Sequence, residues 1–300
     1  MSLTVVGSVA LDTVETPSGK NIEGLGGAAV YFSMAASLFT RVHLVGVVGD
    51  DFPERHVKLL EGKNIDLEGL ERTPGRTFRW SGRYHDDINE RDTLDTQLNV
   101  FEQFHPKVPE TARAAEYLFL ANIHPALQLE VLDQTKPVFA GLDTMNLWIN
   151  TTLDELKAVL RRVDVLIIND SEARLLTETL NLRIAAEHIK ALGPGVVVIK
   201  KGEHGCILFG QEASQMFALP AYPLESVADP TGAGDTFAGG FMGYLAAQES
   251  TDFESLKNAV VHGSALASFT CEDFGPDRLC NVDTAQLEER VAAFKALTSF

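Results

Sequence analysis

A glycine-rich segment near residue 230 holds the residue types that phosphate chemistry uses. Residues 229–235 read DPTGAGD and lead into an amphipathic stretch of helical length. The first N–H groups of a helix have no partners within the helix, and the helix dipole adds partial positive charge there. Glycines let a ligand approach the backbone closely. The segment therefore predicts a site for phosphate or a developing anion, and it is no Walker loop because no Gly-Lys-Ser/Thr follows.

Asp235 closes this segment and has two interpretations. A carboxylate among free N–H groups is well placed to accept a proton from a substrate hydroxyl. The simpler interpretation is that Asp235 only favours the start of the helix, where the dipole attracts an acid. The four residues Gly-x-Gly-Asp do not distinguish the catalytic interpretation from the helix-start interpretation. The longer segment 229–237 is a more specific pattern.

The composition excludes several classes of protein. The chain has 300 residues, of which 45% are hydrophobic and 22% charged, so it can bury a core and is not disordered. A formal net charge of −17 argues against a nucleic-acid partner. The three cysteines form neither a disulfide framework nor a metal-binding spacing. With no membrane-length apolar run and no leader pattern, we expect a cytoplasmic protein without a membrane partner.

The remaining sequence predicts how the site is positioned. Short runs are apolar on successive residues, which is typical of strands buried on both faces of a parallel sheet. Amphipathic stretches of helical length alternate with them, and the chain is mostly helical after residue 232. This order predicts a three-layer α/β/α sandwich with a mostly parallel central sheet. The expected strands are 3–9, 42–48, 117–121, 138–142, 163–168, 196–200 and 206–209; the expected helices include 28–39, 154–161, 183–192, 233–247, 253–270 and 284–297.

One region departs from this pattern. In Thr77–Tyr84 aromatic side chains alternate with Arg79, Ser81 and Arg83, which is typical of a half-exposed strand. A polar turn at 85–90 and a return strand at 91–98 complete a hairpin. We expect a lid, formed by roughly 13–25 and 73–104, inserted in one domain over 1–300. The alternative is an edge hairpin without a role.

Several motifs together resemble one family. The segment DPTGAGDTF at 229–237 is similar to the C-terminal signature of PfkB-type, ribokinase-like carbohydrate kinases, which include ribokinase, fructokinase, 2-keto-3-deoxygluconate kinase and adenosine kinase. The resemblance covers nearly the whole chain. The other motifs, in the family's order, are GSVALD at 7–12, GG at 26–27, DTMN at 143–146, NDSE at 169–172 and KKGEHG at 200–205.

The resemblance implies an ATP-dependent kinase with Mg²⁺ as cofactor. Asp235 would be the general base, and the N–H groups of Gly232, Ala233 and Gly234 the anion hole. Phosphoryl transfer depends mainly on positioning and charge stabilisation, so this small device can suffice.

The same resemblance implies a nucleotide site. Asn169 and Glu172 would organise Mg²⁺ and the phosphates, largely through water. On the residues alone, Asn169 caps a helix and Glu172 is a first-turn acid, and both interpretations can hold together. Lys200 would approach the phosphates from a turn shaped by Gly202 and Gly205. Thr231 joins the nucleotide-binding set, and with Asp229 it implies a monovalent cation such as K⁺.

On the acceptor side, the resemblance implies Asp12 as the ligand of a sugar diol, with Gly26 and Gly27 as a close-approach hinge and Asn146 reaching the pocket. Ribokinase has an asparagine where this chain has Tyr31. An aromatic side chain there suits stacking on a sugar or nucleobase, or packing beneath the lid.

The acceptor class stays open. The leading hypothesis is a sugar or sugar-like hydroxyl, the alternative is a nucleoside, and a non-catalytic ligand sensor is the remote alternative. Lid aromatics suit a nucleoside, whereas the lid arginines suit a carboxylate or phosphate. The apolar face of the lid strand also predicts a homodimer through the lid. The lid arginines that suit an anionic substrate are Arg76, Arg79, Arg83 and Arg91.

Overall fold

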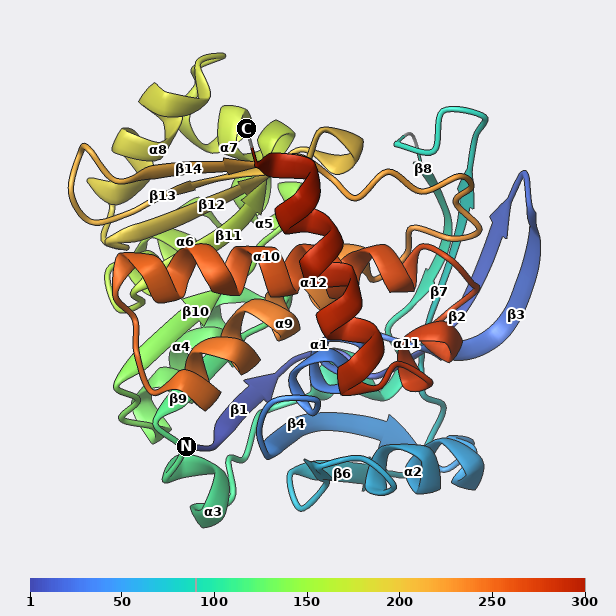
Figure 1. Cartoon of the computed structure of the whole chain (residues 1–300). Coiled ribbons are helices and arrows are strands. Elements are labelled where there is room, and N and C mark those ends of the chain that lie inside the picture. The colour runs from blue at the N-terminus through green and yellow to red at the C-terminus, as the bar shows by residue number, and fades with distance from the viewer. Residues whose placement is uncertain (90, 300) are drawn as a thin grey trace.

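The computed structural model describes residues 1–89 and 91–299. Glu90, expected in the lid turn, and Phe300 lie outside the described residues. A central twisted sheet carries helices on both faces, and a smaller sheet stands at one side of it (Figure 1). This is the α/β sandwich with a small β lid that the sequence predicts.

The central sheet has the order β14-β13-β12-β11-β10-β9-β1-β4-β5, with β6 added beside β4. All pairs are parallel except β12–β13 and β13–β14. Its strands are β1 (Leu3–Val6), β4 (Val42–Gly49), β5 (Ile65–Asp66), β6 (Leu70–Thr73), β9 (Tyr117–Leu120), β10 (Phe139–Leu142), β11 (Val165–Asn169), β12 (Val196–Lys200), β13 (Cys206–Phe209) and β14 (Met216–Leu219).

Successive residues of the inner strands enter different cores, which is why the strands are apolar throughout. On β9, Phe119 joins the core beneath one helical layer, while Leu118 and Leu120 join the core on the other face. The first layer holds α1 (Ala28–Ala36), α9 (Ala233–Gln248), α10 (Phe253–Thr270), α11 (Asp277–Cys280) and α12 (Thr284–Thr298). The second layer includes α3 (Glu110–Arg113), α4 (Pro125–Gln134), α6 (Leu153–Leu160) and α8 (Leu182–Lys190). The other helical elements are α2 (Glu54–Glu61), α5 (Asn146–Thr151), α7 (Asp170–Thr177), η1 (Asn99–Gln103) and η2 (Gly202–His204).

Glycines let α9 pack closely between α1 and α10. A Cβ atom at Gly240 would lie 2.9 Å from the Cα atom of Gly263 on α10, and one at Gly243 would lie 2.8 Å from the Cα atom of Ala36 on α1. Neither neighbour is a flexible side-chain end, so these positions admit no larger residue without movement of a helix. The three helices therefore form one closely packed layer.

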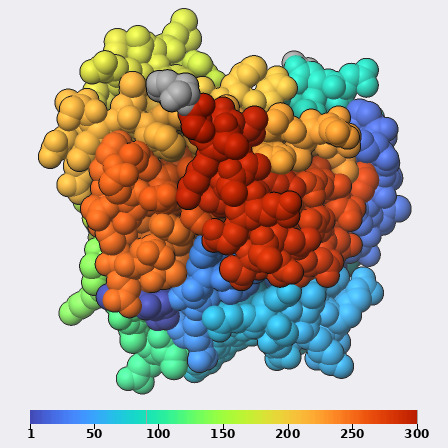
Figure 2. Space-filling model, in the orientation of Figure 1, coloured from blue at the N-terminus to red at the C-terminus, as the bar shows by residue number. Residues whose placement is uncertain are grey.

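The lid is a four-stranded sheet of order β3-β2-β7-β8. Its strands are β2 (Ala10–Thr16), β3 (Gly19–Gly26), β7 (Phe78–Tyr84) and β8 (Arg91–Gln97). The loop between β14 and α9 lies against this sheet (Figures 1 and 2). There Thr16 Oγ1 donates to the carbonyl of Ala228 at 2.8 Å, and Ser18 Oγ donates to that of Val227 at 3.2 Å. The lid is thus closed onto the segment that precedes the glycine-rich turn.

An ion-pair network fixes the point where the lid leaves the body. Asp51, just after β4, accepts hydrogen bonds from the Thr77 N–H and hydroxyl, both at 2.7 Å. Arg79 bridges Asp51 and Glu23 with two contacts of 2.8 Å. Arg79, grouped at first with arginines for an anionic substrate, therefore serves the lid hinge.

Within the described residues, no helix is long and apolar enough to cross a membrane.

Candidate active site

The glycine-rich turn sits where α9 begins. Gly232 is the N-cap of α9 and has a φ of +77°, in the left-handed region that favours glycine. Asp229 is fully buried, and its two carboxylate oxygens accept the N–H groups of Thr231 at 2.8 Å and Gly275 at 3.2 Å. Burial raises the pKa of Asp229, and the Thr231 hydrogen bonds oppose that shift. These bonds hold the turn in place before any ligand binds.

Tyr31 supports the same turn from below. It lies on α1 and is buried, and a Cβ atom at Gly232 would overlap its ring. Burial raises the pKa of the Tyr31 phenol, and the nearby charge of Asp12 raises it further. The ring that the sequence analysis placed among the acceptor contacts is therefore also a packing partner of the turn.

Asp235 lies in the first turn of α9, among its leading N–H groups. Burial raises its pKa to about 7, and the like charge of Asp143 adds to the shift. Lys200 and Arg91 oppose it. A carboxyl that titrates near neutral pH is suited to general-base work.

Lys200 ends β12 and brings its ammonium group to this turn. A Cβ atom at Gly234 would lie 2.8 Å from Lys200 Nζ. The charge of Lys200 also lowers the pKa values of Asp143, Glu172 and Asp235. Positive charge from a side chain and from backbone N–H groups therefore converges on one point.

Asn169 and Glu172 form a capping box at the start of α7. Asn169 Oδ1 accepts from the Glu172 N–H at 2.8 Å, and Glu172 Oε2 accepts from the Asn169 N–H at 3.2 Å. Burial raises the pKa of Glu172 to about 7, and Asp143 is the next cause. The helix-capping interpretation thus holds, and it leaves the acidic group of Glu172 beside a second buried acid.

Asp143 is the site residue to which sequence reasoning gave no role. It follows β10, is buried, and accepts its neighbour Thr144's N–H at 2.8 Å. Burial raises its pKa, and Lys200 opposes the shift. Its position at a strand end, in line with the ends of β11 and β12, was the available signal.

The residues predicted for the acceptor side begin with Asp12 on the lid strand β2. Asp12 is buried and folds over Gly26, where a Cβ atom would overlap its carboxylate. Burial raises the pKa of Asp12 to about 7, and a hydrogen bond from the Gly27 N–H opposes the shift. Gly27, with a φ of +95°, caps α1 and passes close to the carbonyl of Ser8. The diglycine is therefore required by both conformation and close approach.

The two other glycines lie in the turn after β12. Gly202 and Gly205 have φ values of +55° and +76°, and the Lys201 N–H donates to the Gly205 carbonyl at 2.7 Å. Asn89, at the tip of the lid hairpin, lies against Gly202. Asn146 begins α5 near the carboxyl edge of the sheet, and it is exposed.

Two lid residues reach the site besides Asp12. Tyr84 is buried, and its hydroxyl accepts from Thr231 Oγ1 at 3.2 Å. Arg91 lowers the pKa values of Asp12 and Asp235. The alternation of β7 predicts the face that Tyr84 shares with Phe78 and Trp80, but no local pattern singles out Arg91.

Two aromatic residues of lid strand β7, Phe78 and Trp80, contact different parts of the molecule. Trp80 is the strand partner of Asp12, whereas Phe78 stacks on Phe101 of η1 with 5.3 Å between ring centroids. Trp80 therefore stands beside Asp12, while Phe78 packs toward η1.

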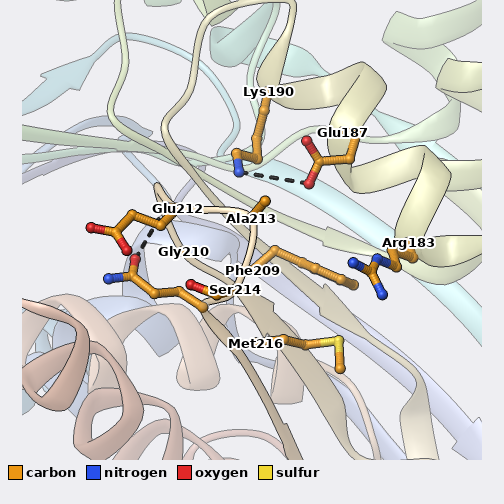
Figure 3. A pocket seen from close by; sticks show the side chains of 10 residues that line it. Arg183, Glu187, Lys190, Phe209, Gly210, Glu212, Ala213, Ser214 and Met216 are labelled. Carbon is orange, nitrogen blue, oxygen red and sulfur yellow. Dashed lines mark hydrogen bonds and ion pairs between the residues drawn. The ribbon is translucent and has the colours of Figure 1, made fainter.

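The pocket in Figure 3 is a separate feature. It lies between α8 and the β13–β14 hairpin, where Lys190 pairs with Glu187 at 3.7 Å and Gln215 Oε1 accepts from the Glu212 N–H at 3.2 Å. Phe209 pairs with Val197 near the amino end of β12, so this pocket is at the sheet edge opposite Lys200.

Comparison with known proteins agrees with this geometry. Residues 3–284 match the model of the pfkB family of carbohydrate kinases. A cytidine kinase of Thermococcus kodakarensis is 31% identical over 249 residues, covering 81% of this chain and 87% of that protein. A nucleoside kinase of Methanothermobacter thermautotrophicus is 27% identical over 288 residues, covering 89% and 84%.

Two solved structures share the fold. A Burkholderia thailandensis nucleoside kinase in complex with inosine has a TM-score of 0.79 at 17% identity, covering 98% of this chain and 99% of that one. A putative ribokinase II from E. coli, in complex with ATP and Mg²⁺, has a TM-score of 0.79 at 18% identity, covering 97% and 99%.

The chain belongs to the pfkB family of carbohydrate kinases. It is therefore a phosphotransferase that acts on a hydroxyl group, as the sequence analysis predicts, and the hypothesis of a non-catalytic sensor is set aside.

Proposed function

We propose that this enzyme transfers the γ-phosphate of ATP to a hydroxyl of a nucleoside, with Asp235 as the general base. The observation that carries the chemistry is Asp235 at the start of α9, next to the glycine amides and Lys200. Two relatives that align with most of the chain are named as a cytidine kinase and a nucleoside kinase, which favours a nucleoside over the bare sugar.

The transfer needs three contributions from the chain. Asp235 takes the proton of the acceptor hydroxyl, whose oxygen forms the new bond to the γ-phosphorus. The bond from that phosphorus to the β–γ bridging oxygen breaks, and ADP leaves. The N–H groups of Gly232, Ala233 and Gly234, together with Lys200, stabilise the charge on the transferred group.

ATP and Mg²⁺ are the proposed cofactors, and the related E. coli structure holds both. Mg²⁺ prefers oxygen ligands and keeps several waters, so it needs few protein groups. Glu172 and Asp143 fit this demand as neighbouring buried carboxyl groups. Burial raises the pKa of each, and the charge of Asp143 raises the pKa of Glu172 further. Within the described residues no group of three or more His, Cys, Asp or Glu side chains forms a closed metal site. When bound, the ion neutralises phosphate charge.

The monovalent cation stays a prediction. Asp229 and Thr231 lie where the family resemblance expects it, but both carboxylate oxygens of Asp229 already accept backbone N–H groups. The homodimer through the lid also stays a prediction.

On the acceptor side, Asp12 would accept two hydrogen bonds from the vicinal hydroxyls of a ribose. Its pKa of about 7 is raised mainly by burial, and hydroxyl donors would favour its charged form. The Gly26–Gly27 backbone would let the ribose approach closely.

A bare sugar is the second candidate, favoured by the family's description as carbohydrate kinases. An assay of ADP release with Mg-ATP distinguishes the nucleoside from the bare sugar as acceptor. The panel is cytidine, uridine, inosine, adenosine, ribose, fructose, gluconate and inositol. We expect at least one nucleoside to exceed every sugar in kcat/KM. A sugar that exceeds every nucleoside would replace the proposal with the second candidate.

A further inference from the structure

The lid presents a flat aromatic surface next to the acceptor carboxylate. Trp80 of β7 pairs with Asp12 of β2, and paired residues of neighbouring strands point to the same face of a sheet. The same face of β7 carries Tyr84, whose hydroxyl accepts from Thr231 Oγ1 of the glycine-rich turn at 3.2 Å. The indole of Trp80 therefore lies on the side of the lid that covers the site.

Gly82 makes this surface flat. A Cβ atom at Gly82 would overlap the six-membered ring of the Trp80 indole. The indole thus lies along its own strand, two residues toward the lid tip, rather than standing off it. Its Nε1 donates to Thr93 Oγ1 at 3.4 Å, which fixes one edge of the ring. Trp80 remains only half-buried.

Arg91 covers the indole of Trp80. Its guanidinium carbon lies 5.0 Å from the centre of the Trp80 ring. A guanidinium is planar and stacks on aromatic rings much as another aromatic ring does. Arg91 is exposed, and the lid's other arginines Arg79 and Arg83 pair instead with acids, Arg83 with Glu15 at 3.3 Å.

The charge of Arg91 also acts on the reaction centre. Burial raises the pKa values of Asp12, Asp235 and Tyr84, and Arg91 opposes each rise, so the guanidinium lies within electrostatic reach of all three groups. A phosphoryl group carried to Asp235 would be a stronger partner for it than the indole, since ionic hydrogen bonds exceed cation–π contacts at exposed sites.

We propose that the Trp80 indole is the platform for the nucleobase of the acceptor, that the base takes the place of the Arg91 guanidinium on it, and that the displaced Arg91 binds the transferred phosphoryl group. This inference rests on the proposed nucleoside kinase function. It makes Trp80 the residue that separates nucleosides from bare sugars, because a sugar has no planar group to displace Arg91. It also adds Arg91 to the groups that stabilise the reacting charge.

The test measures cytidine affinity by calorimetry without nucleotide, and kcat with Mg-ATP, in four variants. Trp80→Phe keeps a flat ring, so cytidine affinity should stay within about 3-fold of wild type. Trp80→Leu keeps apolar bulk without the ring, so affinity should fall about 10- to 100-fold, the range for loss of one base–aromatic stack.

Arg91→Ala gives the distinguishing result. Cytidine affinity should rise or stay unchanged, because nothing has to be displaced, while kcat should fall by about 10²-fold or more. A residue that merely bound the acceptor or stabilised the lid would weaken both. The matched control is Arg83→Ala, on the outer face of the same strand pair, which should change neither quantity.

Two results would overturn the inference: cytidine affinity unchanged in Trp80→Leu, or cytidine affinity weakened in Arg91→Ala. Either result leaves the proposed function intact if wild-type enzyme phosphorylates nucleosides. If the wild-type enzyme phosphorylates none, the panel assay has already rejected the proposed function, and the inference is rejected with it.

Discussion

The catalytic turn and the inner face of the lid meet at one site but are built differently. The turn is anchored by a fully buried carboxylate and by backbone hydrogen bonds, on a helix packed between two others. The lid meets the body through side-chain hydrogen bonds and ion pairs, and its inner face carries the half-buried Trp80 and the exposed Arg91 next to the buried Asp12. The residues proposed for the chemistry are therefore held rigidly, whereas the surface proposed for acceptor recognition includes side chains that can move.

The largest expected effect is on the turn. Asp235→Asn should lower kcat by about 10²- to 10⁴-fold, because it removes the positioned base. ATP affinity, measured by calorimetry, should be retained, since the amides and Lys200 are unchanged. A kcat within 10-fold of wild type would show that the turn does not supply the base.

The same carboxyl predicts a pH dependence. For wild type, kcat/KM should fall as pH drops below about 7, where Asp235 takes up a proton. The folded pKa lies above the unfolded value, so its ionisation destabilises the fold progressively between about pH 4 and pH 7 and fully above. Asp235→Asn should therefore raise the Tm of the ligand-free enzyme at pH 8, and an unchanged or lower Tm would contradict the burial of this charge.

The next effect tests how rigid the turn is. Gly232→Ala forces a side chain into the left-handed region, at a cost of about 1 kcal/mol, and against the Tyr31 ring. We expect kcat to fall about 10- to 100-fold and the Tm to fall by several degrees.

Gly195→Ala is the matched control, because its Cβ would meet only the flexible Gln211 side chain at 3.2 Å and its φ is ordinary. Equal effects of the two substitutions would mean that the turn is not specially constrained.

The smallest effect concerns closure of the lid. Thr16→Val removes the hydroxyl that donates to the Ala228 carbonyl at nearly constant shape. One such hydrogen bond contributes about 0.5–1.5 kcal/mol, so the KM for the acceptor should rise about 2- to 10-fold while ATP affinity stays unchanged. Thr13→Val, whose hydroxyl accepts within the lid from the Glu23 N–H, is the control. If Thr16→Val instead weakened ATP binding and left the KM for the acceptor unchanged, the contact would serve the nucleotide site.

Much of the fold was predictable because strands that are buried on both faces of a sheet appear in the sequence as continuous apolar runs. The strand 196–200 and the helix 253–270 match the structure to the residue. The boundary differs where the chain passes from the body into the lid: the predicted strand 3–9 ends as β1 at Val6, and residues 7–9 connect it to β2, which begins at Ala10.

Within the candidate site, the residues that belong to sequence motifs were predictable. The residues that matter because packing brings them to other elements were not. Asp235 and Lys200 each follow a local signal, a glycine turn and a strand end. Asp143 matters because its charge acts on Glu172 and Asp235 and is opposed by Lys200, and Arg91 because a neighbouring strand brings it to Trp80. Such relations are set by tertiary packing, which no window of sequence contains.

The close packing of α9 on α1 and α10 bears on how this enzyme can diversify. At Gly240 and Gly243 almost any substitution would displace a helix, and the displacement would carry the start of α9 with it. The four lid strands, by contrast, lie at the periphery and share little of that packing. Mutations of lid residues other than Arg91 can therefore alter which acceptor is bound while the packing of these helices is kept, so one catalytic layer can serve a succession of substrate specificities.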